Sequence, residues 1–169
     1  MKSESARMSS AAEARFRIDY PNSEPRVIKV VALDVASERV VKRVAAKPWQ
    51  RANFFTALKF EDTPRGEGWS MQAWLSDLAG RTKALVEEVA AADLVVMVSS
   101  AGTSAQAAAV IGEACAARKV MTMALIIGSE QRSDEELSRT LAALRPYASM
   151  LVIASGDEYI EEMLAALRA

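Results

Sequence analysis

The sequence predicts an α/β fold, a three-layer Rossmann-like sandwich around a mainly parallel, five-stranded sheet. Its strand-like runs are apolar throughout rather than alternating, which is typical of strands buried on both faces. Segments with helical spacing or helix-capping residues separate these runs, as crossover helices do in a parallel sheet. Because such crossovers are right-handed, the helices are expected on both faces of the sheet.

Each predicted strand is a short run of β-branched, aromatic and other apolar residues, which favour strands. The longest run contains Met121 and Met123, and both side chains are expected in the core. The five predicted strands span residues 27–33, 52–60, 93–98, 120–127 and 150–154.

Capping residues and apolar spacing indicate the helices. Ser37 is placed to cap a helix in which the valines share one face. Ser133 with Glu136, and Ser155 with Glu158, form two capping boxes. The predicted helices span residues 37–46, 69–91, 103–118, 133 to about 146, and 155–167.

The chain is expected to form one domain, residues 27–169, preceded by a mobile tail, residues 1–26. Within the tail, residues 16–20 alternate in polarity and could form a short edge strand. The predicted domain has ordinary globular composition, with 51% hydrophobic and 25% charged residues in the whole chain.

The composition excludes several function classes. The 21 Lys and Arg residues against 22 Asp and Glu give a net charge of −1, so no basic footprint for nucleic acid or a membrane surface is expected. There is no histidine, which removes Ser-His-Asp and Cys-His catalysis and histidine metal ligands. We expect no catalytic residues and no metal site, and the balance of features is against an enzyme.

The cysteine count and the apolar runs indicate a compartment. Cys115 is the single cysteine, so no disulfide forms within the chain, and its alanine-rich surroundings predict plain packing. The apolar runs are far shorter than the roughly 20 residues of a membrane span. The N-terminus lacks the apolar segment of a signal peptide. A cytoplasmic protein is therefore expected.

The best candidate for ligand binding is the serine loop, residues 99–104, which follows a predicted strand and opens a predicted helix. Backbone N–H groups, hydroxyl groups and the positive end of a helix dipole suit a phosphate. The alternative is a plain turn with a Ser or Thr helix cap, which would look much the same. The candidate residues for phosphate or nucleotide binding here are Ser99, Ser100, Ala101, Gly102, Thr103 and Ser104.

Two further loops on the same rim supply weaker candidates, Asp34 with Ser37, and Asp157. Asp34 could be a magnesium ligand or a phosphate acceptor, but an exposed or helix-capping aspartate is the simpler interpretation. Its loop has no glycine, unlike a dinucleotide fingerprint, and the chain has no Walker A sequence. Asp157 could meet a ribose or base, although helix capping is again the simpler role.

Two stretches resemble the nucleotide-binding domain of the FtsZ/tubulin family. Residues 27–44 are similar to that family's first strand, loop and helix, and residues 92–112 to its signature strand, phosphate loop and alanine-rich helix. The element order fits over most of residues 27–168. The resemblance implies a nucleotide-binding domain, for which GTP or GDP is the candidate cofactor.

The sequence departs from that family where glycines should allow phosphate to approach the backbone. The first loop has no glycine, and only Gly102, Thr103 and Ser104 match the signature loop. The resemblance therefore implies a shortened nucleotide-binding domain that is not expected to hydrolyse GTP, and whether it still binds GTP stays open.

A second family competes. Residues 93–104 also resemble the phosphosugar-binding loop of sugar isomerase (SIS) domains, through Ser99, Gly102 and Ser104. Three functions stay open: a nucleotide- or phosphate-binding module, a protein-interaction module that forms a homo-oligomer, and a SIS-like phosphosugar-binding protein or isomerase. Trp49, Trp69 and Trp74 are expected to pack in the core or under the long helix 69–91, although exposed together they would mark an interface.

Overall fold

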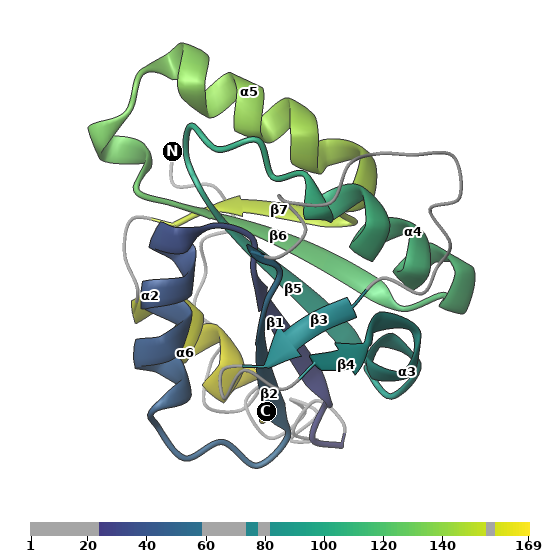
Figure 1. The fold of residues 1–169 in the computed structure, drawn as a ribbon. Coiled ribbons are helices and arrows are strands. Elements are labelled where there is room, and N and C mark those ends of the chain that lie inside the picture. Colours follow the sequence, from purple (N-terminus) through teal and green to yellow (C-terminus); the bar gives the residue numbers. More distant parts are fainter. Residues whose placement is uncertain (1–23, 59–73, 78–81, 155–157) are drawn as a thin grey trace, which may run out of the picture.

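A computed structural model describes residues 24–58, 74–77, 82–154 and 158–169. Its centre is a seven-stranded sheet with the order β4-β3-β2-β1-β5-β6-β7 (Figure 1). Strands β2, β1, β5, β6 and β7 run parallel to their neighbours in this set, and β3 and β4 are antiparallel. The predicted α/β class with five parallel strands is confirmed. The parallel strands are β1 (Ile28–Ala32), β2 (Ala52–Thr56), β5 (Leu94–Ser100), β6 (Met121–Ile127) and β7 (Met150–Ile153).

Helices cover both faces of the sheet and complete the three layers (Figure 1). On one face α3, α4 and α5 cover the α4-side core, which includes Leu85, Ile111 and Leu144. On the other face α2 and α6 cover the α2-side core, which includes Val41 and Leu164. The helices are α2 (Val35–Ala45), α3 (Leu85–Ala90), α4 (Ala107–Arg118), α5 (Asp134–Leu144) and α6 (Glu158–Ala166), and 3-10 turns follow β6 (Ser129–Gln131) and α5 (Arg145–Tyr147).

The long helix predicted over residues 69–91 is wrong. In its place the described residues form strand β3 (Trp74–Asp77), strand β4 (Thr82–Ala84) and the short helix α3. β3 pairs antiparallel with β2, with Phe55 opposite Asp77 and Thr56 opposite Ser76, and β4 pairs with β3. Pairing with an existing sheet edge outweighs the helical spacing of the apolar residues, because tertiary contacts override local preference.

Two smaller predictions also need correction. The helix predicted from residue 103 begins at Ala107, because Gly102 and Ala105 have φ angles of 91° and 47° that no α-helix contains. Met121 is 52% exposed, whereas Met123 is buried as predicted. Met121 is the first residue of β6, so it lies at the end of the sheet, where less of the molecule covers it.

The remaining expectations divide between confirmed and untested ones. Cys115 is buried in the α4-side core, as predicted. Trp49 packs against the α2-side core, and its indole N–H donates to the Val44 carbonyl at 2.8 Å. Residues 1–23 and Trp69 lie outside the described residues. In the part of the chain that is described, no helix has the length and apolarity needed to span a membrane.

A buried lysine on β1 is a feature that the sequence analysis missed. Lys29 is 6% exposed, and its Nζ donates to Asn53 Oδ1 at 2.7 Å and lies 3.0 Å from Glu88 Oε2. The ammonium group also lies 5.7 Å from the centre of the Phe55 ring. These contacts join β1, β2 and α3 at the side of the sheet where β3 and β4 are added.

Gly112 of α4 allows a close contact with the turn that precedes β7. A Cβ added at Gly112 would lie 2.4 Å from Tyr147 Cβ, far inside contact distance. Glycine destabilises a helix interior relative to alanine. At Gly112 this loss accompanies a close contact with Tyr147 that a Cβ would prevent.

We predict that Gly112→Ala lowers the free energy of unfolding by about 1–3 kcal/mol, the usual cost of overpacking. The sign of this change separates two effects. Alanine by itself would stabilise the helix by up to about 1 kcal/mol, whereas the clash with Tyr147 would destabilise the fold. Urea unfolding followed by circular dichroism measures the change. Ala117→Ser, at an exposed position of the same helix, is the control. A variant that is more stable than the wild type would contradict the packing described here.

Candidate functional site

The loops that follow β1, β5 and β6 lie together at the carboxyl edge of the parallel strands (Figure 1). β1 lies between β2 and β5, and the chain order reverses at this point of the sheet. Open α/β sheets bind ligands beyond the strand ends at such a reversal. The serine loop and the Asp34 loop meet here, 66 residues apart in sequence.

Asp34 is the centre of this meeting. Its carboxylate accepts from the Ser37 backbone N–H at 2.9 Å, so Asp34 is the N-cap of α2. The same carboxylate accepts from the Ser100 backbone N–H and the Ser100 hydroxyl, both at 2.7 Å. The hydroxyls of Ser99 and Thr103 lie at 3.3 and 3.4 Å from Oδ2. One side chain therefore joins two loops and the N-terminus of a helix.

This arrangement places a negative charge where a bound phosphate would be expected. Backbone N–H groups from a helix N-terminus and from a loop, together with hydroxyls, are the donors that phosphate sites use. Here the carboxylate of Asp34 accepts from these donors, and the residue is only 6% exposed.

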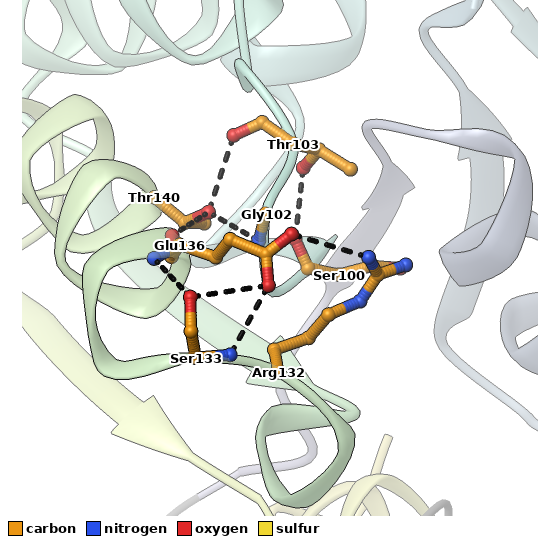
Figure 2. Close-up of polar contacts among 7 residues, drawn as sticks. All are labelled: Ser100, Gly102, Thr103, Arg132, Ser133, Glu136 and Thr140. Atoms are coloured by element: carbon orange, nitrogen blue, oxygen red, sulfur yellow. Dashed lines mark hydrogen bonds and ion pairs between the residues drawn. The ribbon is translucent and has the colours of Figure 1, made fainter.

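The outer side of the serine loop is anchored to α5 (Figure 2). The Gly102 backbone N–H donates to Thr140 Oγ1 at 2.9 Å, and the Thr140 hydroxyl donates to the Thr103 carbonyl at 3.2 Å. Gly102 has a φ of 91°, a backbone conformation that favours glycine. The loop is thus held on both sides, by Asp34 from within the sheet and by Thr140 from the helix.

A second carboxylate lies on this outer side. Glu136 Oε1 is 3.4 Å from the position that a Cβ on Gly102 would take. Its Oε2 accepts from the Ser133 backbone N–H at 3.1 Å, which closes the capping box, and Arg132 contacts Oε1 at 3.3 Å (Figure 2). The Ser133 hydrogen bond first, and the Arg132 charge after it, hold the pKa of Glu136 below its usual range.

The predicted site residues are brought together, but most of them turn inward. Ser99 is buried, Ala101 packs in the α4-side core, and Ser100 and Thr103 are half-buried. Gly102 and Ser104 are exposed. Asp157 lies outside the described residues.

The predicted role of Ser37 as the N-cap of α2 is wrong. Ser37 is the third residue of α2, and Asp34 is the cap. The Ser37 hydroxyl instead accepts from the Asp34 backbone N–H at 3.1 Å, which completes a capping box. The prediction that Asp34 caps a helix is confirmed. The alternative, an exposed Asp34, is wrong, because the carboxylate is enclosed by its hydrogen-bond donors.

Thr140 is the residue of this region that the sequence analysis missed. It falls on the buried stripe of α5, between Leu137 and Leu144, where a polar residue needs a hydrogen-bond partner. A threonine within an otherwise apolar helix face was the available signal. The partner itself, a loop 37 residues earlier, is not visible locally.

The metal-ligating and nucleophilic side chains of the described residues bear most directly on catalysis. Among the described residues, no group of three or more His, Cys, Asp or Glu could hold a metal ion. Burial raises the pKa of the Cys115 thiol to about 11, so this sulfur is a poor nucleophile at neutral pH. The hydroxyls of Ser99 and Ser100 lie against a carboxylate but are already part of a closed set of hydrogen bonds.

We predict that Asp34→Ala lowers the free energy of unfolding by about 3 kcal/mol. The loss of a helix cap costs about 0.5–2 kcal/mol, and donors left without an acceptor add about 1–3 kcal/mol. Urea unfolding measures the change. Ser37→Ala, which leaves the carboxylate in place, is expected to cost less than half as much.

Added formate should restore part of the stability lost in Asp34→Ala and have no such effect on Ser37→Ala, because a small carboxylate can take up the same donors. A loss in Asp34→Ala no larger than that in Ser37→Ala would contradict the central position of Asp34.

We predict that Glu136 stabilises the fold at neutral pH and that this contribution is lost in acid. A carboxyl group with a lowered pKa in the folded state contributes above its unfolded pKa of about 4.3 and loses that contribution as the pH falls through the lower, folded value. The difference in melting temperature between wild type and Glu136→Gln should shrink accordingly below about pH 4. Glu135→Gln, on the exposed side of α5, is the control, and a pH-independent difference would contradict the prediction.

Comparisons with known proteins leave the chain without a family. No family model matches it, and no curated protein matches it. Among solved structures it is similar to translation elongation factor SelB from Methanococcus maripaludis, in complex with the GTP analogue GppNHp. The two share 11% identity with a TM-score of 0.47, over 84% of this chain and 33% of that one. This chain thus spans a third of the length of the SelB chain, and a likeness at this level assigns neither family nor ligand.

Proposed function

We propose that this chain is a non-hydrolysing α/β module that acts through contacts with other proteins. The observation that carries the proposal is the Asp34 carboxylate at the carboxyl edge of the sheet, where open α/β sheets usually bind ligands. It accepts from the Ser37 and Ser100 backbone N–H groups and from the Ser100 hydroxyl. The position that serves a ligand in related architectures is filled by the chain's own anion.

A phosphate would have to displace this carboxylate to reach the same donors. Displacement would leave a buried carboxylate without its hydrogen bonds, beside a second negative charge, and both terms are unfavourable. The neighbouring N–H groups are also engaged: Ala101 donates to the Ile127 carbonyl at 3.0 Å, and Gly102 donates to Thr140. Glu136 adds another carboxylate on the exposed side of the loop.

A second candidate function is binding of a nucleotide or a phosphorylated small molecule. It is favoured by the N-terminus of α4, where Gln106 makes no side-chain capping hydrogen bond and Ser104 is exposed. An FtsZ/tubulin-like module that holds GTP or GDP without hydrolysing it, and a SIS-like phosphosugar-binding protein, both belong to this candidate. Its anion would bind beside Asp34, not in its place.

Thermal unfolding against a ligand panel separates the two candidates. The panel is GTP, GDP, ATP and phosphosugars, each with and without magnesium. We predict no change in melting temperature with any of them. A ligand at 100 times its dissociation constant would stabilise by about 2.7 kcal/mol, which corresponds to a rise of roughly 5–10 °C for a chain of this size.

Two matched variants make a positive result interpretable. Ser104→Asp adds a carboxylate at the exposed end of the serine loop, and Ala117→Asp adds the same charge at the far end of α4. A saturable rise with a nucleotide that is lost in Ser104→Asp and kept in Ala117→Asp would overturn the proposal in favour of the second candidate.

A further inference from the structure

We draw no further inference here: the strongest candidate, the cavity of about 590 Å³ at the amino ends of β1, β2, β5 and β6 that is lined by Arg26, Arg51, Asp93, Lys119 and Met121, carries none, because it begins at Glu24, directly after residues outside the described part of the chain, and nothing in the structure shows what covers it.

Discussion

The carboxylate of Asp34 makes the hydrogen bonds on which the carboxyl edge of this sheet depends. It caps α2 through Ser37 and holds the serine loop through Ser100. Two segments far apart in sequence therefore share one acceptor, at the place where β1 lies beside β5. Asp34 thus holds Ser99 and Ser100 on one side of the serine loop, and Thr140 holds Gly102 and Thr103 on the other.

The sheet is open and mainly parallel, an architecture that often binds ligands beyond its strand ends, while the carboxylates at this edge oppose an anionic ligand. Asp34 lies inside the edge and Glu136 outside it, so the serine loop has a carboxylate on each side. An α/β sheet alone does not specify a function, because the same scaffold supports many sites. The proposed role therefore rests on the side chains at this edge and not on the likeness of the scaffold to other proteins.

Much of the fold could be predicted from sequence because buried parallel strands are recognisable as continuous apolar runs. The hairpin of β3 and β4 could not, since its preference for the sheet depends on pairing with β2, which local spacing does not show. The serine loop was located from its position after β5. The contact of this loop with Asp34 could not be predicted, because no local sequence pattern shows that β1 and β5 are neighbours in the sheet.

The buried Lys29–Glu88 pair has a consequence for how the molecule opens. A buried ion pair gains little net stability, because both groups are well solvated once released. Separating α3 from the sheet would return Glu88 to water and expose the Lys29 ammonium group, while most of the two apolar cores stays intact. We therefore expect the amide hydrogens of α3 to exchange with solvent before those of β1 and β5.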